Sequence, residues 1–446
     1  MRILLFIVLL MVSAECFAQR EMSVEYADSI TQLLYDNQQW KELSRVGERA
    51  VDAGVESYLV RVRTGVAYYE LEEYARAIPH LRKAVDTGYS DGIVKEKLYY
   101  SYKLTGRDED ANDVFFDMTD SRQRKLRPLL NDFIYDAFGG FAYSFTNDES
   151  NNGSIDLDGN DNVFGEQTIS GNKSGFHLGL SQLPIRWLKV SYAFTYVNSG
   201  RQKQFMNNNL RYTKSYKQKQ GRLFNEFNFR VIEGLVIAPA GQYVNTKETL
   251  PAVTQVNNEY VFADSVVEQD DFVLSLTASK WFSVFKASLT GSFSYLNGEH
   301  QTQFGASMKV YPLRESYLYL NSDFVLHDQN SVSNLVFTQS AGGRLAEDLW
   351  LEAFATFGKM NNFNEQNGFV VYNDPDVITL KYGAEMKYIF PFNLTASLFY
   401  EGSSREKDYT TFDLSGYNNK TPVYSPQSKS ADYSMSTIAL LLKYDF

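Results

Sequence analysis

Apolar and polar residues alternate, one for one, through most of the C-terminal part of this chain. In PFNLTASLFYEG, for example, Leu394, Ala396 and Leu398 fall on one face, and Thr395 and Ser397 fall on the other. Such stretches recur with a length of about ten residues. Because successive side chains of a β-strand point to opposite faces, each stretch predicts a strand with one apolar and one polar face.

The connections between these strands are expected to differ in length. Short turns are expected near 183–184, 232–234, 281–283, 312–315, 347–348 and 391, and longer polar loops near 147–170, 198–216, 247–266, 360–375 and 404–431. The breaks give about fourteen antiparallel strands. Twelve or sixteen strands are the alternatives, because strand boundaries are uncertain by about two to four residues. Strands joined in this way predict a transmembrane β-barrel over residues 134–446. A soluble all-β sandwich or propeller is the alternative, but it lacks this alternation of short and long connections.

The last strand, STIALLLKYDF, ends on an aromatic residue. Ile438, Leu440 and Leu442 are expected to face lipid, and the strand must pair with the first one so that no edge is left exposed in the membrane. Tyr444 and Phe446 resemble the C-terminal signal by which bacterial barrels are recognised for insertion. That resemblance implies the barrel insertion machinery and outer-membrane lipids as partners. The aromatic content of 15% suits the aromatic girdles of such barrels.

The N-terminus has the pattern of a secretory signal peptide. Arg2 precedes an unbroken apolar run from Ile3 to Val12, and small residues stand near Ala18 for cleavage before Gln19. We therefore expect residues 1–18 to be removed on export. Cys16 is the only cysteine, so we expect no disulfide and no thiolate chemistry in the mature chain.

Residues 19–121 are expected to form helical repeats, followed by a basic linker over residues 122–133. AVDAG at Ala50 recurs as AVDTG at Ala84, an offset of 34 residues. That offset is the tetratricopeptide period, and the segment resembles about three such repeats. Small residues where two helices cross and aromatic residues between helix pairs would explain the pattern. The residues that carry the signature are Gly65, Tyr68, Ala77, Ala84, Ala111 and Phe115.

The polar faces of the strands carry charges of both signs. Such a lumen suits either a hydrated conduit or an interior closed by ion pairs, and fourteen strands lie between the packed and open extremes of barrel size. The sequence therefore also allows a lumen that is plugged by a loop or by another segment of the chain. The charges expected to face the lumen are Arg222, Glu226, Arg230, Lys286, Asp323, Glu352, Lys381, Glu385, Lys387, Lys443 and Asp445.

We expect neither enzymatic activity nor a cofactor or metal site. The four histidines are scattered without metal-ligand spacing, and no nucleophile-elbow, zinc-protease or phosphate-loop pattern occurs. The net charge of -11 argues against a nucleic-acid partner, because such a partner requires a basic surface.

A periplasmic repeat region joined to a barrel resembles two families. Surface lipoprotein assembly modulators combine tetratricopeptide repeats with a fourteen-strand barrel, and exopolysaccharide export porins combine longer repeats with a larger barrel. The first resemblance implies an outer-membrane protein of Gram-negative bacteria that helps to translocate or assemble a surface component, with a protein or peptide client bound by the repeats. An exopolysaccharide exit pore, and a passive porin or anchor that binds an envelope partner, are the alternatives.

Overall fold

The computed structural model describes residues 22–88, 92–127, 134–146, 152, 164–207, 210–256, 259–282, 284–312, 317–418 and 421–446. The expected signal peptide and residues 128–133 of the expected linker lie outside them. The chain divides into a helical unit that ends at Leu126 and a barrel unit that comprises Arg127–Val310 and Tyr317–Phe446. No helix in the described part of the chain is long and apolar enough to cross a membrane.

The helical unit consists of helix pairs that recur along the chain. Its helices are α2 (Val24–Asp36), α3 (Trp40–Asp52), α4 (Tyr58–Glu70), α5 (Tyr74–Asp86), α6 (Gly92–Leu104), α7 (Asp108–Phe116) and α8 (Asp120–Leu126). The first helices of the three pairs start at 24, 58 and 92 and the second at 40, 74 and 108, so both series step by 34 residues. The sequence period is therefore the period of the helix pairs. The first part of the expected linker lies in α8.

Close packing explains the repeated residues. A Cβ on Gly65 of α4 would lie 2.7 Å from the side chain of Leu81 of α5, so only glycine lets these two helices approach so closely. The side chains of Ser23 and Ser57 cap the starts of α2 and α4 by accepting backbone hydrogen bonds. All six signature residues lie in the described part of the unit, and the five with side chains are almost completely buried.

A polar network is enclosed among α3, α4 and α5. Glu48 accepts a hydrogen bond of 2.8 Å from the Tyr68 hydroxyl and lies 3.5 Å from the ring of His80. Burial, together with the charge of Arg61, lowers the pKa of His80 and outweighs the opposing effect of Glu48. Burial opposes ionisation of Glu48, but the Tyr68 hydrogen bond and the nearby His80 and Arg76 hold its pKa below the usual value. The network therefore favours a neutral His80 beside an ionised Glu48.

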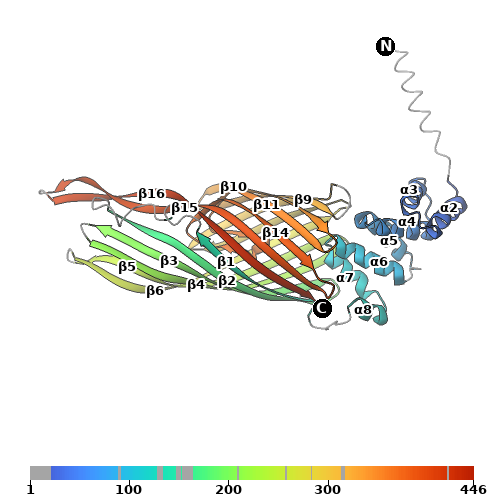
Figure 1. Ribbon diagram of the computed structural model, residues 1–446, viewed down its shortest axis with the longest axis horizontal. Helices are drawn as coiled ribbons and strands as arrows, with labels where there is room; N and C mark the ends of the chain where they lie inside the picture. The colour runs from blue at the N-terminus through green and yellow to red at the C-terminus, as the bar shows by residue number, and fades with distance from the viewer. Residues whose placement is uncertain are drawn as a thin grey trace, which may run out of the picture. The chain divides into compact units, whose positions relative to one another are not determined.

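The barrel unit contains a closed antiparallel sheet of fourteen strands (Figure 1). Its strands are β1 (Asp136–Thr146), β2 (Gly165–Ile185), β3 (Leu188–Asn207), β4 (Leu210–Ile232), β5 (Leu235–Val256), β6 (Glu259–Trp281), β7 (Phe285–Leu296), β8 (Glu299–Val310), β9 (Leu318–Gln329), β10 (Val332–Ala346), β11 (Leu349–Met360), β14 (Val377–Ile389), β15 (Leu394–Asn418) and β16 (Thr421–Asp445). Strands β1 and β16 close the barrel, with Asp136 opposite Asp445 and Phe141 opposite Leu440. The fold class expected from the sequence is confirmed.

Several connections expected to be long loops are instead extended hairpins. Residues 198–216, 247–266 and 404–431 lie mainly within β3–β4, β5–β6 and β15–β16, which remain paired far beyond the shorter strands β7 to β11 (Figure 1). The ladder of backbone hydrogen bonds continues there although these segments are rich in polar residues. The expectation of irregular loops at these three places was wrong.

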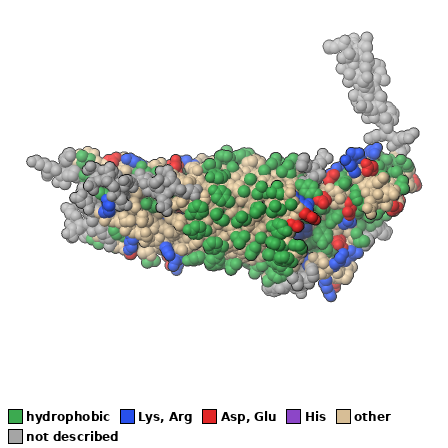
Figure 2. Space-filling model, in the orientation of Figure 1, with side chains coloured by type: hydrophobic (Ala, Val, Ile, Leu, Met, Phe, Trp, Pro, Cys, Tyr) green, Lys and Arg blue, Asp and Glu red, His purple; other side chains and the backbone are tan. Residues whose placement is uncertain are grey.

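A band of apolar side chains surrounds the outside of the barrel, and Figure 2 shows it on one face. Leu178, Leu223, Leu274, Leu326 and Leu440 are each more than half exposed although the sheet around them is closed. Such a band on a closed barrel is the surface that lipid covers in transmembrane barrels. Beside it, the backbone N–H of Phe446 donates to Tyr135, and the Phe446 ring lies against Tyr444 with centroids 4.9 Å apart.

Candidate functional site

The connection between β11 and β14 folds into the interior of the barrel. We call residues 361–376 the lumen loop. It contains a small hairpin, β12 (Phe363–Glu365) and β13 (Val370–Tyr372), that pairs only with itself and is separate from the barrel sheet. The turn η1 (Gln366–Gly368) joins the two short strands. This loop leaves one wall of the barrel and contacts the inner faces of β4, β5 and β6, far from it in the sheet order.

The tip of the lumen loop is held by a dense set of hydrogen bonds. The Asn367 amide donates to Glu226 at 2.8 Å and to the Ala238 carbonyl at 3.0 Å. Ser275 and Thr277 donate to the backbone and side-chain oxygens of Asn367 at 2.6 and 2.9 Å. Asn367 has a φ of 56°, a left-handed conformation that asparagine tolerates better than most residues. The tip is therefore a tight turn built to fit this wall.

Phe369, next to the tip, lies among three rings that come from β1, β2 and β4. Its ring centroid is 5.2 Å from that of Phe224, 6.1 Å from that of His177 and 6.4 Å from that of Phe138, all at steep interplanar angles. Gln242 donates to the Phe369 carbonyl at 2.9 Å. Edge-to-face contacts of this kind are favourable beyond the apolar area that they bury.

Two further apolar side chains fix the stem of the loop. Phe363 packs against Val336, Met360 and Ile378, and Val371 packs against Val273 and Leu296 on β6 and β7. Polar contacts supplement this packing, because Lys381 of β14 bridges Glu365 and Tyr372, at 2.7 Å from the Glu365 carboxylate and 2.6 Å from the Tyr372 hydroxyl. Both strands of the small hairpin are thus tied to the barrel wall.

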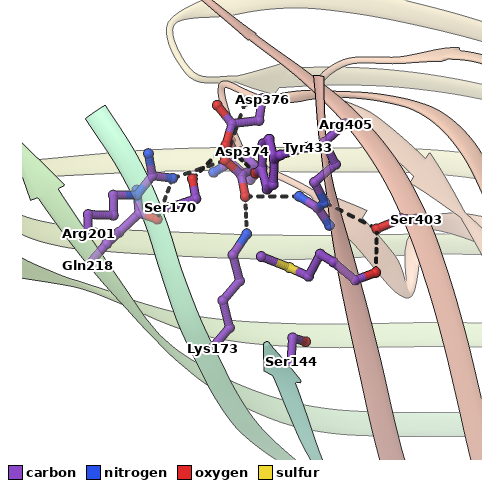
Figure 3. A network of polar contacts seen from close by, with 12 residues as sticks. Ser144, Ser170, Lys173, Arg201, Gln218, Asp374, Asp376, Ser403, Arg405 and Tyr433 are labelled. Atoms are coloured by element: carbon purple, nitrogen blue, oxygen red, sulfur yellow. Dashed lines mark hydrogen bonds and ion pairs between the residues drawn. The ribbon is translucent and has the colours of Figure 1, made fainter. Parts of the chain in front are cut away.

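An ionic cluster holds the end of the loop that returns to β14 (Figure 3). Asp374 accepts from Arg201 of β3 at 3.0 Å and from Arg405 of β15 at 3.3 Å, and Lys173 of β2 forms a close ion pair with it. Asp376 accepts hydrogen bonds of 2.6 Å from Ser170 and from Tyr433. Asp374, Arg201 and Arg405 are all less than a tenth exposed. Strands β2, β3 and β15 therefore converge on one carboxylate of the loop.

A chamber of about 780 Å³ lies against the lumen loop. Among the described residues that line it are six carboxylates but a single ammonium group, that of Lys381. Glu352 and Glu385 are directly opposite each other on neighbouring strands, an arrangement of like charges that destabilises a sheet. The stacked rings of Phe354 and Phe399 add an apolar patch. The carboxylates are those of Glu226, Asp323, Glu352, Glu365, Glu385 and Glu401.

Five of the charges expected in the lumen line this chamber, namely Glu226, Asp323, Glu352, Lys381 and Glu385. Sequence reasoning did not single out Glu365 and Glu401, which complete the acidic lining. Glu365 lies in a segment expected to be an ordinary loop, and no short-range pattern marks it. Glu401 alternates with apolar residues in the same way as the others and could have been included.

The other expected lumen charges lie outside the chamber lining. Lys443 forms ion pairs with Asp445 at 2.8 Å and with Asp136 at 3.7 Å, and Lys387 lies 3.4 Å from Glu385. Lys286 lies over the ring of Trp281. Arg230 shares the face of β4 that carries Glu226. Arg222, also on β4, donates to Gln220 at 2.7 Å.

Comparisons with known proteins found no matching family model and no matching curated protein. They therefore support neither the tetratricopeptide label nor the resemblance to surface lipoprotein assembly modulators. Among solved structures, the toluene transporter TodX of P. putida is similar over 74% of this chain and 93% of its own, with 8% identity and a TM-score of 0.48. A FadL homologue of Pseudomonas aeruginosa is similar over 70% of this chain and over 90% of its own length, with 8% identity and a TM-score of 0.44.

Proposed function

We propose that this chain forms an outer-membrane passage for small polar solutes, with a preference for cations, in which the lumen loop sets the constriction. The observation that carries this proposal is the chamber of about 780 Å³ with six carboxylates and one ammonium beside a loop that crosses the barrel. That volume is in the range of small-molecule sites, about 300–1,000 Å³. Carboxylates that line a narrow lumen attract cations and repel anions.

The location proposed from the sequence fits this role. Strand β1 begins opposite the end of β16, so both ends of the sheet lie at the same rim as the short turns. In transmembrane barrels the short turns face the periplasm. We therefore place the helical unit, which precedes β1 in the chain, in the periplasm.

The ion selectivity of the purified chain in a planar lipid bilayer tests the proposal. In a gradient of KCl, the reversal potential should report a preference for K⁺. The double variant Asp323→Asn and Glu385→Gln removes two chamber charges with little change in shape, and its reversal potential should move towards zero. Glu268→Gln, on an exposed side chain of β6, is the matched control and should leave the potential unchanged. A preference for Cl⁻ in the unaltered protein would contradict the proposal.

A second candidate function is the translocation or assembly of a surface lipoprotein or another protein client. The helical unit favours it, because Leu59 and Ile93 occupy equivalent positions on the first helices of two pairs, 34 residues apart, and are 43% and 52% exposed. Repeated helix pairs commonly bind peptides on such a face. The test is deletion of residues 24–121, after which surface display of the lipoprotein client should fall. Unchanged display of every lipoprotein would exclude this candidate.

A further inference from the structure

Three rings on the inner wall of the barrel form a recess that holds Phe369. We call Phe138 of β1, His177 of β2 and Phe224 of β4 the aromatic socket. They come from separate strands and face the lumen, and Phe224 is almost completely buried. Ala193 and Ala240 complete the apolar lining beside Phe224. The surrounding inner wall is largely polar, with Gln220, Gln242, Ser275 and Thr277 nearby in the sheet.

Glycines make room for the socket rings. A Cβ on Gly140 would lie 2.7 Å from the imidazole of His177, and a Cβ on Gly179 would overlap the ring of Phe138. Both glycines face the lumen, and each lies opposite a socket ring in the register, Gly140 of β1 opposite His177 and Gly179 of β2 opposite Phe138. Glycine at these positions lets two rings lie back against the wall, and so it leaves the space that Phe369 enters.

Phe369 occupies the socket as a partly exposed ring. It belongs to a loop and not to the wall, and it meets all three socket rings at interplanar angles between 71° and 85°. Such edge-to-face geometry distinguishes an aromatic ring from a saturated ring of similar size. The ring of Phe369 thus shows that the recess fits an aromatic group.

A carboxylate stands beside the socket. Glu226 lies two residues from Phe224 on the same face of β4, lines the chamber and accepts a hydrogen bond from the loop tip. Two residues along a strand span about 7 Å between Cα atoms, so the carboxylate is a near neighbour of the socket. The wall therefore presents an aromatic recess with a negative charge beside it.

We propose that the aromatic socket recognises the ring of a small aromatic cation that enters the passage, with Glu226 as the partner of its ammonium group and Phe369 as the resident that it displaces. This inference rests on the proposed function and names the class of solute. Displacement of Phe369 would also loosen the tip of the lumen loop, because the same solute competes for Glu226.

Current recordings on the full chain test the inference with three probes. Phenethylamine carries the ring and the ammonium, 2-cyclohexylethylamine has a saturated ring, and phenylacetate has the opposite charge. Phenethylamine should interrupt or modulate the current at roughly two- to tenfold lower concentration than its cyclohexyl counterpart, as expected for the preference between aromatic rings. Phenylacetate should act more weakly than both. Equal potency of the two amines would overturn the inference.

Two variants separate recognition from a merely structural effect. Phe224→Leu keeps an apolar side chain but removes a ring, and it should abolish the difference between the two amines. Phe369→Ala removes the resident ring and should increase the potency of phenethylamine, whereas a decrease would contradict competition. Heat-modifiable migration confirms that each barrel is folded. If removal of the loop tip raises conductance but phenethylamine and 2-cyclohexylethylamine act at equal concentrations, only the inference about the aromatic socket fails. An unchanged conductance contradicts the proposed function itself.

Discussion

Replacement of residues 364–371 by a short Gly-Ser link is expected to raise single-channel conductance several-fold. These residues form the tip and most of the small hairpin, and they provide the hydrogen bonds that reach β4, β5 and β6. Phe363 and Tyr372 are register partners, so a short link can join them without disturbing β11 or β14. A fourteen-strand barrel without its inner loop has a lumen between the packed interior of about eight strands and the open channel of about sixteen.

The measurement is the unitary current in a planar lipid bilayer at fixed voltage. The matched control removes residues 252–255 and 260–263, four opposing pairs of the β5–β6 hairpin and the same number of residues in total. The control should conduct like the unaltered protein, because those pairs lie outside the part of the barrel that the loop crosses. Equal conductance of all three proteins would show that the lumen loop does not limit the passage.

The strands could be predicted from sequence because lipid and lumen impose opposite requirements on neighbouring residues. On β14, Tyr382 and Met386 are exposed on the outside while Lys381 and Glu385 line the chamber, so the pattern of single residues reports both faces. The turns near 232–234 and 347–348 could be placed for the same reason, since the alternation stops there.

The extended hairpins could not be predicted in this way. Beyond the membrane both faces of a strand meet water, and polar residues such as Thr213, Lys214 and Ser215 follow one another directly, so the apolar alternation is broken. Their strand structure depends on backbone pairing, which extends between β3 and β4 to Asn207 opposite Leu210. Polar composition alone therefore led to the expectation of loops where ordered hairpins occur.

The lumen loop was expected near residues 360–375, but not its position inside the barrel. One local signal was available, since Phe363 and the unbroken run from Phe369 to Tyr372 interrupt a polar segment, and so many apolar or aromatic side chains are unusual in a surface loop. The contacts that the loop makes with the barrel wall could not be predicted from the sequence. Lys173 and Arg201 are separated from Asp374 by 201 and 173 residues, and no spacing rule connects positions so distant. The ionic cluster follows from closure of the sheet.

Asp374→Asn is expected to release the returning end of the lumen loop. Asparagine preserves the shape of the side chain but removes the charge that Lys173, Arg201 and Arg405 share. Loss of one partner from a buried ion pair costs about 3–5 kcal/mol, because the remaining charges stay desolvated without compensation. Asp376 retains its hydrogen bonds to Ser170 and Tyr433 and offsets part of that cost. Even about 3 kcal/mol would change the ratio of released to docked loop by more than about a hundredfold.

The lifetimes of conducting levels in single-channel records measure this change. Asp374→Asn should show long openings at the level of the protein that lacks residues 364–371, whereas the unaltered protein should visit that level rarely. Asp264→Asn is the matched control, since Asp264 pairs with Lys214 on an exposed part of β4 and β6, where an ion pair contributes about 1 kcal/mol or less. It should leave the lifetimes unchanged. If Asp374→Asn opens no more often than Asp264→Asn, the hydrogen bonds of Asn367 and the packing of Phe369 hold the loop without help from the ionic cluster.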